Sequence, residues 1–86
     1  MQIEGAVLRE QGVTFAIVVV KRHVVDNRTE AQSAIRSFGS VFPGMPIVLM
    51  AQDSSGQPTY FGRTDIANFM SNVSPSRVPW KRYTIN

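Results

Sequence analysis

Cysteine is absent from this 86-residue chain, and histidine occurs only once. Without cysteine the protein has no disulfide, no thiolate nucleophile and no cysteine-ligated zinc. The single histidine, His23, follows two cations and has only Asp26 as a nearby acid, so nothing in the sequence positions it as a general base. The chain also lacks the Gly-x-Ser-x-Gly and Ser-x-x-Lys motifs of serine nucleophiles. We therefore predict that the protein is not an enzyme and that it has no metal site and no cofactor.

Long hydrophobic runs are missing as well. The longest apolar run covers residues 15–20, whereas roughly 20 residues are needed to span a bilayer. The chain begins Met-Gln-Ile-Glu, without the basic and apolar regions of a signal peptide. A chain of 86 residues forms one domain, which we assign to residues 1–86. We expect a cytoplasmic protein with no membrane partner.

Acidic side chains are missing from the C-terminal part of the chain. Asp65 is the last of them, and the net charge of +3 therefore arises after it, because the residues up to Asp65 contain six cations and six acids. The three later cations are interleaved with two aromatic residues. This basic and aromatic segment is the best candidate for contact with a partner or with nucleic acid, and it comprises Arg77, Trp80, Lys81, Arg82 and Tyr83.

This segment has two interpretations. Aromatic side chains that stack on bases and cations that follow a phosphate backbone are typical of single-strand binding. Three cations neutralise about three phosphates, however, which corresponds to a log–log salt slope near −2.7 on duplex DNA and to weak binding. Alternatively, an extended segment places Trp80 and Arg82 on one face and Tyr83 and Ile85 on the other. It would then close the sheet as an edge strand, with its charges opposing unwanted pairing.

The first half of the chain predicts a hairpin and a helix. Residues 3–9 and 13–21 form strands around a turn that contains Gly12. The second strand is apolar on both alternating faces, so either helices cover both faces or one face is buried in a dimer. Asn27 and Glu30 resemble a capping box and begin a helix over residues 28–38. Gly39 stands where a left-handed residue commonly ends a helix.

The second half of the sequence again predicts two strands followed by a helix, and then one further strand. Residues 47–51 form a second continuous apolar strand, and a polar loop leads to a returning strand over residues 59–61. A second helix begins near Thr64 and ends before Pro75. A last strand covers residues 82–85. The order is β-β-α-β-β-α-β, and we predict an α+β fold with one mixed sheet of four to five strands and two helices mainly on one face.

The apolar content of the two continuous strands exceeds what two short helices easily cover. Three methionines, Met45, Met50 and Met70, add adaptable apolar surface. Exposed apolar patches are often interfaces, whereas a well-packed monomer core is the alternative. We predict a small non-enzymatic protein–protein interaction module that self-associates, with a homodimer as the simplest form. The alternative function is weak nucleic-acid binding through the basic and aromatic segment.

Overall fold

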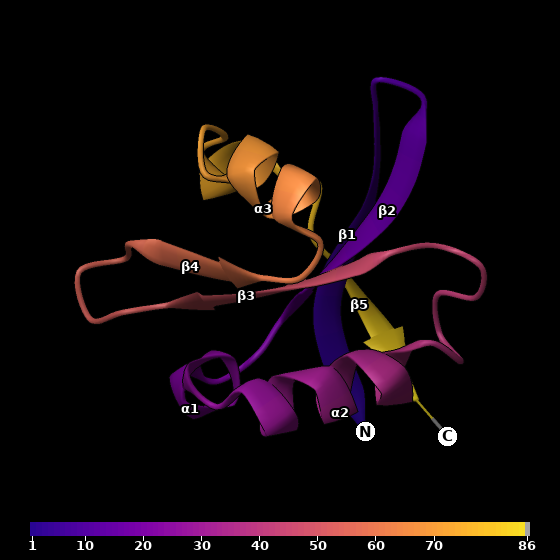
Figure 1. Ribbon diagram of the computed structural model, residues 1–86, viewed down its shortest axis with the longest axis horizontal. Coiled ribbons are helices and arrows are strands. Elements are labelled where there is room, and N and C mark those ends of the chain that lie inside the picture. Colours follow the sequence, from indigo (N-terminus) through magenta and orange to yellow (C-terminus); the bar gives the residue numbers. More distant parts are fainter. Residues whose placement is uncertain (86) are drawn as a thin grey trace.

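A computed structural model describes residues 1–85. Its strands form one mixed five-stranded sheet with the strand order β4-β3-β2-β1-β5 (Figure 1). The predicted α+β fold class is confirmed, and a short helix and a 3-10 turn join the predicted elements. The elements, in chain order, are β1 (Gln2–Glu10), β2 (Val13–Val19), α1 (Arg22–Asp26), α2 (Arg28–Phe38), β3 (Ile47–Gln52), β4 (Pro58–Phe61), α3 (Thr64–Met70), η1 (Pro75–Arg77) and β5 (Lys81–Thr84).

Both predicted hairpins are present. Strands β1 and β2 pair in antiparallel fashion, with Glu10 opposite Val13, and the two residues between them have positive φ, 51° at Gln11 and 79° at Gly12. Two consecutive positive φ angles make the type I′ turn, whose twist matches that of the strands. Strands β3 and β4 are also antiparallel, whereas β2 and β3 are parallel and are joined through α1 and α2.

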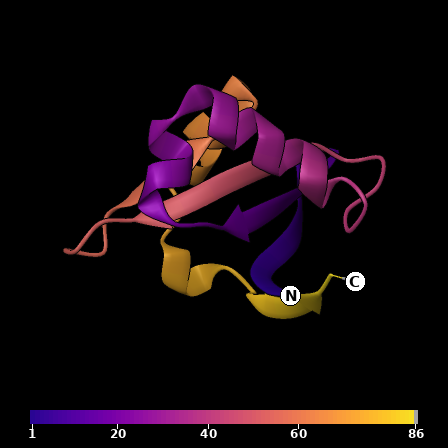
Figure 2. The same cartoon turned by 90° about the horizontal axis from the view of Figure 1, so that it is seen from below.

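The helices lie on both faces of the sheet, as Figures 1 and 2 show. Ala31 and Phe38 of α2 pack in one apolar cluster, whereas Ile66 and Met70 of α3 pack in the other. We expected the two helices mainly on one face, and α3 instead covers the face opposite to α1 and α2. The physical reason is that β2 and β3 are apolar on both sides, so each side needs a cover.

The central part of strand β2, residues 15–18, is buried on both faces within one chain. Ile17 and Val18, which are consecutive and point to opposite faces, both have 0% of their surface exposed, as do Val48 and Leu49 of β3. Of the two explanations for the apolar β2, cover by helices on both faces is therefore the one that the structure shows. The apolar faces of β2 and β3 consequently give no reason for self-association.

Helix α2 has the predicted bounds, and the Asn27 side chain accepts a hydrogen bond from the Glu30 backbone N–H at 3.0 Å. The rest of the capping box is absent, because the Glu30 carboxylate lies 2.9 Å from His23 Nδ1. The prediction that Gly39 has a left-handed conformation was wrong, because its φ is −60°. Its backbone N–H instead continues the last helical turn by donating a hydrogen bond to the Arg36 carbonyl. Within residues 1–85 no helix is long and apolar enough to cross a membrane.

Candidate interaction surfaces

The basic and aromatic segment forms one edge of the sheet. Strand β5 pairs with β1 and lies at the end of the strand order. Trp80 packs against the α3 side, where its Nε1 donates a hydrogen bond to the Pro75 carbonyl at 2.9 Å. Tyr83 packs on the α2 side, edge-on to Phe42 with ring centroids 4.8 Å apart. The predicted alternation of side chains is confirmed, and it separates the two aromatic residues that we had grouped as one candidate contact.

The three cations of this segment remain at the surface. Arg77 in η1 and Lys81 and Arg82 in β5 are all exposed, and none of them forms an ion pair with an acidic side chain among the described residues. Lys81 and Arg82 are consecutive and therefore project to the two faces of the edge strand. This edge of the sheet thus carries positive charge on both faces, which is a common protection against pairing with another strand.

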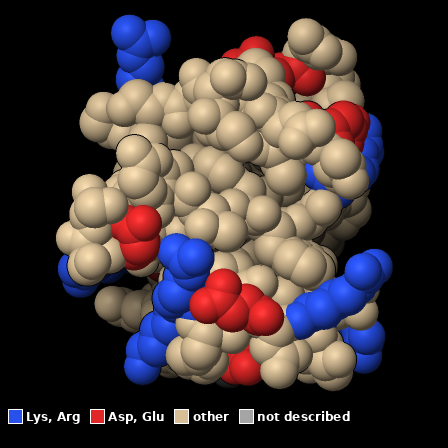
Figure 3. Space-filling model, turned by 60° about the vertical axis from the view of Figure 1, so that its left-hand side comes forward, with Lys and Arg blue, Asp and Glu red and all other residues tan. Residues whose placement is uncertain are grey.

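The opposite edge of the sheet carries no charge. Strand β4 consists of Pro58, Thr59, Tyr60 and Phe61, all of them half-buried, and only one of its sides is paired, with β3. On the side of the molecule with the β3–β4 hairpin, charged side chains surround an uncharged central area (Figure 3). From the sequence, we predicted only that this strand pairs back with the strand before it. The sequence signal of this uncharged edge is the absence of any charged residue from residue 58 to residue 62.

Tyr60 adds a second feature to this edge. Its hydroxyl is buried without a hydrogen-bond partner, the one such side-chain atom among the described residues. Burial raises the pKa of the Tyr60 phenol above its ordinary value, because the charged phenolate is poorly solvated there. A buried polar group without a partner costs roughly 1–3 kcal/mol. Strand β4 thus has a buried polar side-chain atom without a hydrogen bond, whereas the inner strands of the sheet have none among the described residues.

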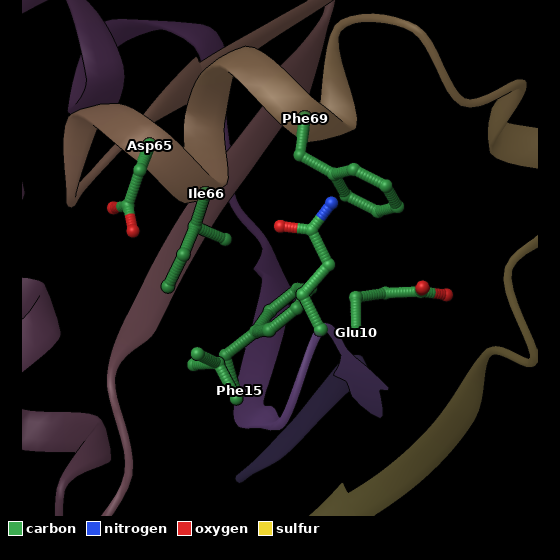
Figure 4. A pocket seen from close by; sticks show the side chains of 7 residues that line it. Glu10, Phe15, Asp65, Ile66 and Phe69 are labelled. Atoms are coloured by element: carbon green, nitrogen blue, oxygen red, sulfur yellow. The ribbon is translucent and has the colours of Figure 1, made fainter.

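A cleft of about 100 Å³ lies between the β1–β2 turn and α3 (Figure 4). Apolar side chains from both elements form its floor, among them Phe15, Ile66 and Phe69. Glu10 and Asp65 lie at opposite sides of these residues. The sequence does not predict this cleft, because residues about 55 positions apart in the chain form it (Glu10 and Asp65).

The two carboxylates of the cleft have different partners. Arg63 Nε and Nη2 donate to the two carboxylate oxygens of Asp65, each at 2.8 Å. These hydrogen bonds to the Arg63 guanidinium lower the pKa of Asp65 below its ordinary value. Glu10, in contrast, has no ion-pair partner among residues 1–85. The two carboxylates that border the cleft therefore differ, because Asp65 is paired with Arg63 whereas Glu10 is exposed and has no ion-pair partner among the described residues.

In the part of the chain that the structure describes, no group of three or more His, Cys, Asp or Glu side chains is placed to hold a metal ion. Comparison of the chain with protein-family models, with curated proteins and with solved structures gave no match. The function is therefore inferred from the surfaces described above.

Proposed function

We propose that the protein is a non-enzymatic protein–protein interaction module that self-associates through the outer edge of β4. The observation that supports this proposal is the contrast between the two edges of the sheet. Lys81 and Arg82 stand in β5, whereas residues Pro58–Phe61 of β4 carry no charge. A cytoplasmic location belongs to the same proposal.

The contrast favours a second copy of the chain as the occupant of the β4 edge. A twofold contact brings the same strand of each copy together. At β5 this would place Lys81 and Arg82 close to their own copies, and like charges at an interface cost several kcal/mol. At β4 no like charges meet. Antiparallel pairing of β4 with its copy would satisfy the free backbone groups of both strands, which is the usual basis of strand addition.

A charge introduced into β4 should weaken the dimer. We expect Thr59→Lys to raise the dimer dissociation constant about tenfold or more, since each 1.4 kcal/mol of like-charge repulsion is worth a factor of ten. The measurement is sedimentation velocity or light scattering over a dilution series. Thr84→Lys is the matched control, because Thr84 lies in β5 at the other edge and the substitution changes the net charge equally. This control should leave the dissociation constant unchanged.

Two further measurements make this test decisive. Thermal unfolding followed by circular dichroism shows whether Thr59→Lys still folds. An equimolar mixture of Thr59→Lys and Thr59→Glu chains should associate again, because the two charges then attract one another across the strand pair. A wild-type chain that stays monomeric at the highest concentration, or a Thr84→Lys variant that dissociates as readily as Thr59→Lys, would contradict the proposal.

The second candidate function is weak nucleic-acid binding, and the exposed, unpaired cations Arg77, Lys81 and Arg82 favour it. Stacking has less support than charge, because Trp80 and Tyr83 pack on opposite faces of the sheet. We expect any binding to duplex DNA to have a log–log salt slope no steeper than about −2.7, set by three phosphate contacts.

Titration with oligonucleotides at low salt, followed through the fluorescence anisotropy of Trp80, measures this binding. Replacing Arg77, Lys81 and Arg82 together by Gln should abolish it. The matched control replaces Arg9, Arg28 and Arg36, which are also exposed, and removes the same charge elsewhere. Unchanged emission and anisotropy in the wild-type protein, or equal losses in both triple variants, would exclude the proposed nucleic-acid site.

A further inference from the structure

We infer that two copies of the chain join at β4 in one register, with the twofold axis at Tyr60, so that the Tyr60 backbone of each copy bonds to the Tyr60 backbone of the other. This inference rests on the proposed self-association and names the contacts that would form it. Three features of β4 support it: the direction of its backbone groups, the proline at its start, and the glycine that follows it.

The Tyr60 backbone points away from the sheet. In β3, the Met50 carbonyl accepts a hydrogen bond from the Val20 N–H at 2.9 Å, so the backbone groups of Met50 point toward β2. Because these groups alternate along a strand, Ala51 bonds to its partner Thr59 in β4, and Tyr60, the next residue of β4, faces outward. Strand β4 is the last of the sheet (Figure 1), and no turn or loop backbone within residues 1–85 bonds to Tyr60.

Pro58 and Gly62 limit the register. Pro58 faces outward as Tyr60 does, but proline has no N–H. Gly62 lies beyond the end of β4, and a Cβ there would stand 3.0 Å from the Ile47 carbonyl oxygen, so its backbone packs closely on β3 as the chain turns toward α3. Tyr60 is therefore the one residue of β4 that offers both an N–H and a C=O at the open edge. Only a twofold axis at Tyr60 pairs both groups within β4, through the reciprocal hydrogen bonds of an antiparallel pair.

The side chains of β4 suit the same register. With the axis at Tyr60, the two Tyr60 rings would lie side by side on the face that α3 covers. On the other face, Thr59 of each copy would lie opposite Phe61 of the other copy. Aromatic–aromatic and aromatic–β-branched pairs are among the cross-strand pairs that stabilise sheets. The register thus pairs every side chain from Thr59 to Phe61 with a favourable partner.

This contact would also end the assembly at two copies. Joining two sheets at β4 leaves β5 at both ends of the continuous sheet. Both ends then carry Lys81 and Arg82, which oppose the addition of a further strand. A symmetric contact that occupies the uncharged edge of each copy therefore gives a closed dimer and no fibre.

Cysteine cross-linking tests the register, because the chain has no cysteine of its own. With the axis at Tyr60, position 59 of one copy and position 61 of the other are directly opposite, with Cα atoms about 4.5 Å apart, a distance that a disulfide spans. On oxidation with oxidised glutathione, an equimolar mixture of Thr59→Cys and Phe61→Cys chains should give at least about tenfold more covalent dimer than either variant alone. Non-reducing electrophoresis and mass spectrometry measure the yield.

Each variant alone is the matched control. In the inferred register, two copies of position 59 or two copies of position 61 lie diagonally, roughly 8 Å apart, which is beyond the reach of a disulfide. Efficient cross-linking of Thr59→Cys alone would place the axis at Thr59, and that of Phe61→Cys alone would place it at Phe61. Either result overturns the inference. Circular dichroism shows whether both variants fold.

Amide hydrogen exchange gives a second measurement, on the unaltered chain. The Tyr60 N–H should exchange at least about tenfold more slowly above the dimer dissociation constant than below it, because only the dimer provides its acceptor. The Thr59 N–H is the internal control, since Thr59 pairs with Ala51 within one chain and its exchange should not depend on concentration.

The register and the self-association can fail separately. If dilution shows a dimer but Tyr60 exchange is independent of concentration, or the mixture gives no more covalent dimer than the single variants, the register is wrong and self-association stands. A chain that stays monomeric at every concentration contradicts the self-association and the register together.

Discussion

Replacement of Ile17 by Ala should lower the free energy of unfolding by about 3 kcal/mol, and Leu49→Ala should cost about as much from the opposite face of the sheet. Both side chains are 0% exposed, but Ile17 belongs to the cluster under α3 and Leu49 to the cluster under α1 and α2. Each substitution removes buried methyl groups and leaves a cavity that the rigid strands cannot fill. Urea unfolding monitored by circular dichroism measures both losses.

The control for these substitutions is Val7→Ala. Val7 lies in β1 and is 41% exposed, so its truncation should change the free energy of unfolding by less than about 1 kcal/mol. The comparison of Ile17 with Leu49 tests whether the sheet is covered on both faces within one chain. If either face were open in the monomer, truncation on that face would resemble Val7→Ala. A loss below about 1 kcal/mol at Ile17 or Leu49 would contradict the fold described above.

Gly5→Ala should destabilise the protein by about 2–3 kcal/mol, although it adds only one methyl group. Gly5 lies in β1 between its partners Val18 in β2 and Lys81 in β5. An added Cβ would stand 2.7 Å from the backbone carbonyl oxygen of Ile17, which cannot move without breaking the β1–β2 pairing. Glycine at a strand position commonly marks such a close approach of backbone.

The same substitution would disturb the aromatic pair that fixes β5. The added Cβ would lie 3.6 Å from Phe42 Cζ and 3.7 Å from Tyr83 Cε1, the two rings that pack edge-on over this position. Gly39→Ala is the matched control, because Gly39 has a right-handed φ of −60° that alanine adopts readily. At Gly39, the added Cβ would stand 3.2 Å from the Arg36 carbonyl oxygen, a close contact that a small shift relieves, so the unfolding free energy should change by less than about 1 kcal/mol. Equal losses in the two variants would contradict the role assigned to Gly5.

The two edges of the sheet connect this fold to its proposed function. Strand β5 closes one edge and carries Lys81 and Arg82, and its aromatic neighbours are used for packing on the sheet. Strand β4 leaves the other edge uncharged. An edge strand without charge is a template for pairing with another chain. The proposed dimer therefore uses the one edge at which the sequence provides no electrostatic obstacle.

Local patterns predicted the local features of the fold. The Asn27 cap, the bounds of α2, the turn at Gly12 and the alternation along β5 were all predicted, because each depends on residues only a few positions apart. The short helix α1 was not predicted. Its Arg22 and Asp26 form an i,i+4 ion pair at 3.3 Å, but a single helical turn with two valines resembles the end of a strand in sequence.

The candidate sites required contacts between distant parts of the chain. The sequence predicted the basic and aromatic segment because its residues are adjacent, and the structure then divided that segment between two faces of the sheet. It did not predict the cleft, which Glu10 and Asp65 both border only because α3 packs over the β1–β2 hairpin. It also did not distinguish the β4 edge, because a strand becomes an edge only through the order of its neighbours.

The sequence by itself determined the class of fold, the order of most elements and the need to cover β2 on both faces. Periodicity and capping act over a few residues, so the sequence expresses them directly. Only the tertiary structure decided the strand order, the placement of α3 opposite α2, and hence which edge is charged and where the cleft lies. These features depend on pairings such as that of β1 with β5, at opposite ends of the chain. Such pairings are chosen by the packing of the whole core, and no local pattern encodes them.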